Sequence, residues 1–411
     1  MTIPVKFRGW ARGVDNVHQD YEIPSDSLRR GVNVDILDSG KIRRRKGFTQ
    51  TLASSGAHSL WSDGTVAYFV QNNQLRKFYE NGTSVSLGTI AAGANRVSYV
   101  KVGQDVYFTC ATARGKIKNG TLASWGVEVP ATPPTVTTTA GVLPPGTYYA
   151  AVTYVMPDGR ESGASLLTQT TLSTDGGVTV TSMPIPVDAT ITKKRLYLST
   201  ADGEILYMAA ELGAADLFAT ISSPVSGAEL RTAYLSTPPL GSAIAYTNGR
   251  IFVVDVADPR VVWFTEALDY DHVDTRKGYY TFGAPVSVIA GTSDGLYVCA
   301  DMTYFIPGAG SPDATQRMVL EFGAIAGSET TIPFSTDVIW MTEQGPVIGK
   351  DGGVIEMLSK ERMSPGGMAD AAAMVRDKDS VRQYVVVGSN IDSSSLQAGS
   401  YAEAEIVRRA G

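Results

Sequence analysis

The chain has 411 residues, of which 42 are glycine and only 18% are charged, and its formal net charge is −6. Its length exceeds that of one small domain, and the glycine-rich, weakly charged composition favours an all-β chain over a largely helical one. Residues 1–50 hold ten Lys or Arg against six Asp or Glu, so this segment carries +4 and the rest carries −10. An acidic body argues against a non-specific grip on nucleic acid, which needs many cations.

A hairpin with a basic return strand is predicted near the N-terminus. Between Leu28 and Phe48, apolar residues alternate with polar ones up to an Asp38-Ser39-Gly40 turn, and a run of four cations follows on the return strand. A single basic run without interleaved aromatic residues is a weak footprint for DNA. A solvated strand face, or a site for intersubunit ion pairs, is therefore the favoured interpretation.

Short apolar runs with turn residues between them recur along the body of the chain. They predict strands at 66–70, 97–100, 105–108, 250–254, 261–264, 295–298 and 337–341. Four-stranded units repeated around an axis would bury the apolar faces of these strands and protect their edges. The pattern predicts a β-propeller, with a pair of β-sandwiches as the alternative.

The amino-acid composition changes between Pro130 and Pro239, where the chain is rich in Thr, Ser and Ala. Strands are expected at 146–155, 166–172, 177–181, 194–198 and 205–209. About a hundred residues with about seven short strands is the size of an immunoglobulin-like or fibronectin-like β-sandwich. We therefore predict propeller residues at 1–130, an inserted sandwich at 131–237, and the second part of the propeller with a C-terminal tail at 238–411. Short helices are expected at 367–375 and 401–409.

Sequence motifs for catalysis or metal binding are weak along the whole chain. Gly291-Thr292-Ser293-Asp294-Gly295 fits the pattern of a nucleophile elbow, but a strand rather than a helix follows it, which favours a hairpin turn. The acidic residues Asp269, Asp271 and Asp274 could offer oxygen ligands to Ca²⁺, yet they lack the glycine and distal glutamate of an EF-hand, so a solvated loop is favoured. We predict no catalytic, cofactor-binding or metal-binding residues.

Several smaller features have structural interpretations. The three histidines lack the spacing of zinc ligands. Cys110 and Cys299 lie in separate apolar strands and are expected to be buried free thiols. The Asn-Gly-Thr sequences at 81–83 and 119–121 are expected to be turns rather than glycosylation sites. The charged N-terminus does not resemble a signal peptide, and no run has the length of a membrane helix, so synthesis in a cytoplasm is expected.

The N-terminal hairpin resembles the corresponding segment of nozzle (tail tubular) proteins from short-tailed bacteriophages. The residues that carry this resemblance are Leu28-Arg29, Asn33-Val34, Gly40-Lys41-Ile42-Arg43-Arg44 and Gly47-Phe48. Residues 146–162 also resemble sandwich modules of phage tail proteins. The run from Trp263 to Asp271 is similar to a stretch of phage tail propellers, where it forms a blade and an interblade loop.

The resemblance implies a non-enzymatic structural protein of the virion tail, made in the host bacterial cytoplasm. Such nozzle subunits form a homo-hexameric ring below the portal and adaptor, which closes the DNA channel and passes DNA during ejection without sequence-specific binding. They contact the head-to-tail adaptor and the tail fibres or spikes. In this view the basic arm faces a neighbouring subunit or the adaptor through the assembly residues Arg29, Arg30, Arg43, Arg44, Arg45 and Lys46.

Two other classes of function remain open from the sequence. The first is a glycan-binding adhesin that recognises the host, for which paired tyrosines such as Tyr148-Tyr149 and Tyr279-Tyr280 could supply a face. Such tyrosines in strands more often pack in the core or across strands. The second is a propeller hydrolase that depends on Ser293 or Asp271, which is disfavoured because no catalytic constellation accompanies these residues.

Overall fold

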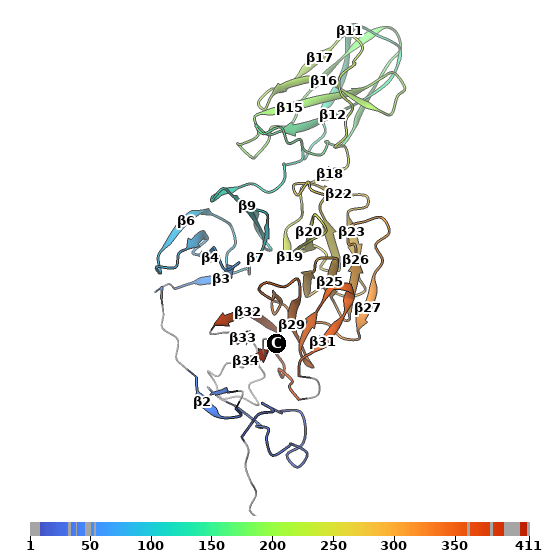
Figure 1. Ribbon diagram of the computed structural model, residues 1–411. Coiled ribbons are helices and arrows are strands. Elements are labelled where there is room, and N and C mark those ends of the chain that lie inside the picture. The colour runs from blue at the N-terminus through green and yellow to red at the C-terminus, as the bar shows by residue number, and fades with distance from the viewer. Residues whose placement is uncertain are drawn as a thin grey trace, which may run out of the picture.

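The computed structural model describes residues 9–31, 34–37, 39–45, 51–52, 55–359, 362–378 and 381–389, and the backbone of 403–408. Within these residues the chain is all-β, and its one helical element is a single 3-10 turn, η1 (Asp351–Gly353). The body is a β-propeller, from which a two-sheet module projects at one end (Figure 1). The repeated short strands of the sequence predicted this fold class.

The described part of the propeller contains five four-stranded sheets and one three-stranded sheet, each made of antiparallel strands in chain order. The first two sheets are β3 (Ala57–Ser62), β4 (Ala67–Gln71), β5 (Gln74–Phe78) and β6 (Ser84–Thr89), then β7 (Ser98–Val102), β8 (Asp105–Thr109), β9 (Arg114–Lys118) and β10 (Thr121–Ala123). The third and fourth are β19 (Gly241–Thr247), β20 (Arg250–Asp255), β21 (Val261–Phe264) and β23 (Tyr279–Thr281), then β24 (Val288–Gly291), β25 (Gly295–Cys299), β26 (Thr303–Pro307) and β27 (Arg317–Leu320). The last two are β28 (Thr330–Thr331), β29 (Val338–Thr342), β30 (Gly345–Gly349) and β31 (Ile355–Met357), then β32 (Asp370–Lys378), β33 (Val381–Ser389) and β34 (Glu403–Arg408).

Successive sheets are held together by hydrophobic clusters between their faces. In β25, Leu296 and Val298 enter the cluster shared with the preceding sheet, and Tyr297 and Cys299 enter the cluster shared with the following one. Alternate residues of a strand point to opposite faces, so a strand between two neighbours must be apolar on both. Five such clusters join the sheets in order from the first to the last. This packing explains why the central strands read as continuous apolar runs.

Polar contacts join the last sheet to the connection between the first two. Arg96, just before β7, donates from Nη1 to the backbone oxygen of Ala371 in β32 at 3.2 Å. The same guanidinium lies 3.5 Å from Asp370 and 3.5 Å from Glu329. Among the described residues, no hydrophobic cluster contains members of both the first and the last sheet. Arg96 therefore supplies a polar contact where the two ends of the series of sheets meet.

The inserted segment forms two sheets that share one core. Its strands are β11 (Thr135–Leu143), β12 (Gly146–Val155), β13 (Thr168–Leu172), β14 (Gly176–Thr181), β15 (Lys193–Ser199), β16 (Leu206–Gly213) and β17 (Ala219–Ile221). The sheet orders are β11-β14-β17 and β13-β12-β15-β16, and residues of both sheets such as Val152 and Val180 are buried in one cluster. The first two strands lie in different sheets, whereas an immunoglobulin constant domain pairs its first two strands. The closer assignment to an immunoglobulin-like or fibronectin-like sandwich stays a prediction.

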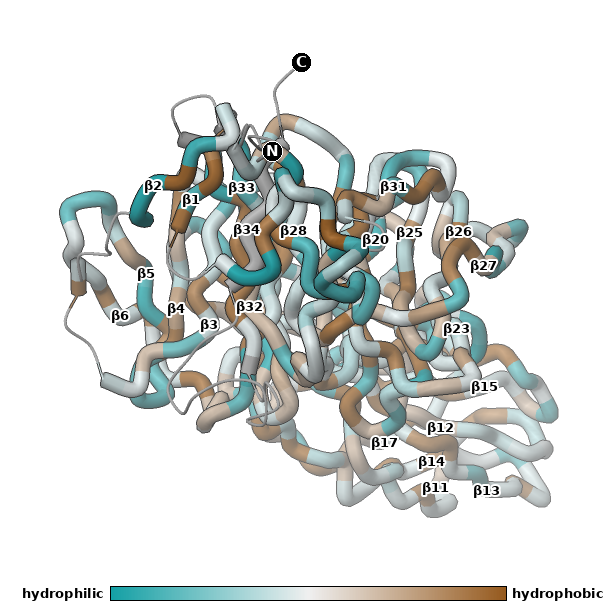
Figure 2. Tube along the Cα trace, turned by 90° about the horizontal axis from the view of Figure 1, so that it is seen from below, coloured by the Kyte–Doolittle hydropathy of each residue, from teal (hydrophilic) through white to brown (hydrophobic). Residues whose placement is uncertain are grey.

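The inserted module and the N-terminal arm lie at opposite ends of the body (Figure 1). The chain leaves the propeller after β10 and returns at β18 (Leu235–Ser236), which pairs with β22 (Val273–Asp274). The arm contains the predicted hairpin, β1 (Val34–Ile36) and β2 (Ile42–Arg44), which pair in antiparallel register. Seen from below, the arm lies in front of the body and the inserted module lies behind it (Figure 2).

The two helices predicted near the C-terminus are wrong. Residues 370–378 form β32, where Ala371 is buried and Ala372 is exposed, and then Ala373 is partly buried and Met374 is exposed. Residues 403–408 form β34, which pairs with β33. A run of alanines has a high helix propensity, but β33 offers β32 a full antiparallel ladder. Tertiary pairing therefore overrides the local preference.

Candidate interaction surfaces

The predicted assembly residues lie on the arm, and three of them are engaged within it. Arg43 and Arg45 each approach Asp35 at 3.3 Å. Arg29 lies 3.6 Å from Asp20 and also donates to the backbone oxygen of His18. The hairpin register explains the first pair, since Asp35 of β1 is directly opposite Arg43 of β2. These three cations are partly neutralised inside the arm.

Arg30 and Arg44 are the remaining described cations of the set. Both side chains face solvent, and neither has an ion pair with any residue that the structure describes. Lys46 lies outside the described residues. The five described residues of the set therefore lie on one arm, and Arg30 and Arg44 are the two of them without an ion-pair partner among the described residues.

Asn16 docks the arm against the propeller. Its side-chain Nδ2 donates to the backbone oxygen of Ser364 at 2.8 Å, and its Oδ1 accepts from the backbone nitrogen of Ser364 at 2.9 Å. Its backbone nitrogen donates to the oxygen of Arg362 at 2.9 Å. An asparagine amide supplies one donor and one acceptor side by side, which matches a peptide group. This contact fixes the arm beside the segment between β31 and β32.

A buried ion network joins the propeller to the inserted module. Lys116 of β9 donates to both carboxylate oxygens of Asp271, at 2.8 and 2.9 Å, and both side chains are buried. Arg160 of the inserted module approaches the same carboxylate at 2.9 Å and also pairs with Asp158. Burial alone would raise the pKa of Asp271, but Lys116, the Gly126 amide and Arg160 outweigh it and hold that pKa below its ordinary value.

His272 adds a second contact across the same junction. Its Nε2 lies 2.8 Å from the backbone oxygen of Glu161, and its Nδ1 lies 2.8 Å from Asp269. A carbonyl and an ionised carboxylate can only accept, so both ring nitrogens must donate and the geometry favours the imidazolium. Burial would lower the pKa of His272, but the hydrogen bond and charge of Asp269 outweigh burial and raise it.

The interpretation of the 269–274 segment as a solvated loop is wrong. Asp271, His272 and Asp274 are buried, and the three aspartates have different partners: His272, Lys116 with Arg160, and Arg276. Within the described residues, no group of three or more His, Cys, Asp or Glu side chains could hold a metal ion. Sequence reasoning missed this junction because Lys116 and Asp271 are 155 residues apart.

Other predicted features are where the sequence put them. Residues 291–295 form the turn of the β24–β25 hairpin, and the Ser293 amide donates to Asp351 of the neighbouring sheet at 3.0 Å.

Cys110 and Cys299 are buried free thiols, as predicted, and burial raises the pKa of Cys299 to about 12. Asn119 and Gly120 both have positive φ, of 51° and 76°, in the β9–β10 turn, which is the conformation that Asn-Gly favours. No helix of the described residues is long and apolar enough to cross a membrane.

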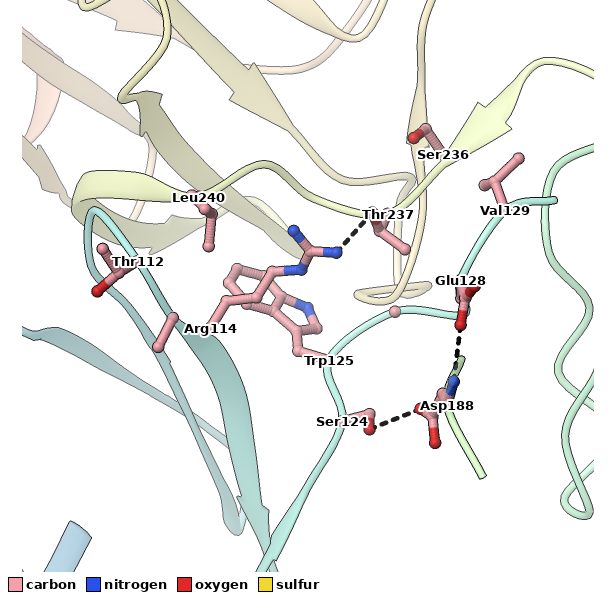
Figure 3. Close-up of a pocket in the computed structure, with 12 residues that line it drawn as sticks. Thr112, Arg114, Ser124, Trp125, Glu128, Val129, Asp188, Ser236, Thr237 and Leu240 are labelled. Atoms are coloured by element: carbon pink, nitrogen blue, oxygen red, sulfur yellow. Dashed lines mark hydrogen bonds between the residues drawn. The ribbon is translucent and has the colours of Figure 1, made fainter. Parts of the chain in front are cut away.

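A cavity of about 520 Å³ lies beside the junction (Figure 3). Arg114 and Trp125 line it from the second propeller sheet and the segment after it, and Asp188 lines it from the inserted module. Trp125 is fixed by its Nε1, which donates to the backbone oxygen of Tyr270 at 2.6 Å. The cavity is therefore bounded by both parts of the chain.

Comparisons with known proteins leave the function open. No family model and no curated protein matches the chain. Among solved structures, the chain is similar to virginiamycin B lyase from Staphylococcus aureus, with 12% identity over 80% of this chain and 91% of that one, at a TM-score of 0.32. It is also similar to the Pan2 WD40 domain of Neurospora crassa (10%, 81% and 89%, 0.34) and to BBS1N in complex with ARL6DN (9%, 88% and 96%, 0.36). At these identities and scores the likenesses carry no argument about activity.

Proposed function

We propose that this protein is a structural, non-enzymatic subunit of a bacteriophage tail, and that it assembles into a ring at the tail nozzle. The proposal rests on the resemblance of the N-terminal hairpin and on one observation of the structure. That observation is the basic arm, which projects from one end of an acidic propeller and holds Arg30 and Arg44 in solvent.

Charge separation of this kind favours association between copies. The arm segment is net positive while the remainder of the chain carries −10, so the arm of one copy is attracted to the body of the next. A contact between two different surfaces is heterologous. It produces a closed ring when the rotation from one copy to the next is a whole fraction of a full turn. An acidic adaptor surface would attract the same two arginines. The hexameric symmetry, the adaptor contact and the fibre contact belong to the proposal.

The acidic body also suits a conduit for DNA. A lining with few Lys and Arg releases few counterions when DNA enters, so it holds the polyanion only weakly. Weak holding is what a channel needs if DNA is to slide through without sequence-specific binding. The proposal therefore assigns the cations of the arm to protein contacts and not to DNA.

Electron microscopy of the purified protein, alone and mixed with the portal and adaptor of its virion, tests the proposal. We expect ring-shaped particles with a central opening for the native protein. The double variant R30E/R44E should stay monomeric or lose its adaptor contact, and it should keep the native melting temperature. The matched control R231E reverses an exposed arginine away from the arm and should still form rings. Native particles that stay monomeric with the adaptor present would refute the nozzle assignment and favour the glycan-binding alternative.

A further inference from the structure

The cavity beside the junction has walls of opposite charge. Figure 3 shows Arg114 with Trp125 on one side and Glu128 with Asp188 on the other. Its volume, about 520 Å³, is within the range of pockets that hold small molecules, about 300–1,000 Å³. The cavity is separate from the arm that carries the proposed function, so the inference below does not depend on that function.

Arg114 is the cation of this cavity, and it lacks a carboxylate partner. Its Nη2 donates to the Thr237 hydroxyl at 2.9 Å, and no carboxylate of the described residues forms an ion pair with it. The neighbouring cations Lys116 and Arg160 both pair with Asp271. Burial lowers the pKa of Arg114, because no nearby anion offsets the loss of water around it. A guanidinium has five N–H donors in a planar fork that matches a carboxylate.

The opposite wall holds two carboxylates with fixed positions. Glu128 accepts from the backbone nitrogens of Val187 and Asp188, the latter at 2.8 Å. Asp188 accepts from the Ser124 hydroxyl at 2.9 Å and from the amide and hydroxyl of Thr190. Burial would raise the pKa of Asp188, but these hydrogen bonds outweigh it and keep that pKa below its ordinary value. Asp188 therefore stays negative near neutral pH.

We propose that this cavity binds a small zwitterion whose carboxylate pairs with Arg114 and whose ammonium group faces Glu128 and Asp188. A simple anion would meet Arg114 but would be repelled by two carboxylates across the cavity, and a simple cation would be repelled by Arg114. A molecule with both charges, held apart by a short chain, satisfies both walls. Because Arg114 belongs to the propeller and Asp188 to the inserted module, the bound molecule bridges the two parts.

A length series of ω-amino acids tests the proposal. Glycine, β-alanine, γ-aminobutyrate and ε-aminocaproate place the two charges at increasing separation, and acetate and propylamine supply each charge alone. Binding to the full chain is measured by calorimetry and by NMR line broadening of the ligand. We expect saturable binding with an optimum at one chain length, and affinities at least about tenfold weaker for acetate and for propylamine.

Variants assign the two walls. R114Q should weaken binding of the best ligand by about tenfold or more, and D188N should do the same. R231Q changes an exposed residue that does not line the cavity and should leave the affinity unchanged. The native protein should also lose affinity as salt rises, which tests the charge pairing even if a cavity variant does not fold. No saturable binding by any member at ~10 mM would overturn the proposal. Binding that is unaffected by R114Q, or as strong for acetate alone, would overturn it as well.

Discussion

The junction with the inserted module and the N-terminal arm both contain ion pairs, but in different surroundings. At the module, Lys116 and Asp271 pair with side chains that are 4% and 10% exposed. In the arm, Arg43 pairs with Asp35, and the Arg43 side chain is 56% exposed. Water and salt screen the second pair but hardly reach the first. The same ion-pair chemistry is therefore strong at the junction with the module and weak within the hairpin of the arm, which Asn16 holds on the propeller by hydrogen bonds.

This difference suits the proposed roles of the two ends. A buried charge that loses its partner is costly, so the network of Lys116, Asp271 and Arg160 tolerates only one arrangement of module and propeller. Exposed pairs can exchange partners at little cost. An arm that must reach another subunit benefits from pairs that can be exchanged.

The largest expected effect comes from breaking the buried network. D271A leaves Lys116 buried without its carboxylate and removes one partner of Arg160, so we expect a loss of about 3 kcal/mol in the free energy of unfolding. Urea unfolding measures the loss, and limited proteolysis should show faster cleavage between 127 and 134. The control R43A breaks an exposed pair and should cost less than about 0.5 kcal/mol. Equal effects of the two variants would contradict the comparison.

Removing Arg96, which joins the last sheet to the connection between the first two, should cause an intermediate loss of stability. R96A removes the contacts with Ala371, Asp370 and Glu329. The Arg96 side chain is 37% exposed, so we expect the free energy of unfolding to fall by about 1–2 kcal/mol. Burial raises the pKa of Glu329, and Arg96 opposes this rise. Without Arg96 the ionised carboxylate loses its nearby cation, so the loss should be greater above the raised pKa of Glu329 than below it. A loss that does not change with pH would show that Glu329 is not coupled to Arg96.

His272 makes the junction sensitive to pH. Its folded-state pKa is raised above the ordinary value of 6.5, so its contribution is complete below that value and is lost as pH rises through the raised pKa. We expect the free energy of unfolding of the native protein to fall by about 1 kcal/mol between mildly acidic and alkaline pH. H272Q should lack this dependence on pH. Urea unfolding across the pH range measures both. An identical slope in H272Q would assign the titration to another group.

The arm should show the smallest effect on stability. N16A removes two hydrogen bonds with Ser364, which are exposed, so we expect a loss of about 0.5–1 kcal/mol. The main result should be faster proteolysis within residues 9–45 while the propeller stays intact. N16D keeps the acceptor and loses the donor, so it should be intermediate. Slower or unchanged cleavage in N16A would show that other contacts hold the arm.

Much of the fold could be predicted from the sequence because it follows from local patterns. The predicted strand at 146–155 coincides with β12, and the Gly-x-Ser-x-Gly segment is a hairpin turn since an apolar strand follows it. The alternation of apolar and polar residues within 28–48 predicts a hairpin, and β1 and β2 form one. These features depend on neighbours within a few positions, where periodicity and turn chemistry decide.

Short windows of the sequence are enough to encode the all-β class, the strands with two apolar faces and the turns between them. Long-range contacts make residues 370–378 a strand and bury Asp271 between Lys116 and Arg160. They also leave Arg30 and Arg44 as the two described cations of the predicted assembly set without an ion-pair partner. The physical reason is that these outcomes depend on partners distant in the chain. Burial and pairing then set the energy of a residue whose local pattern permits several states.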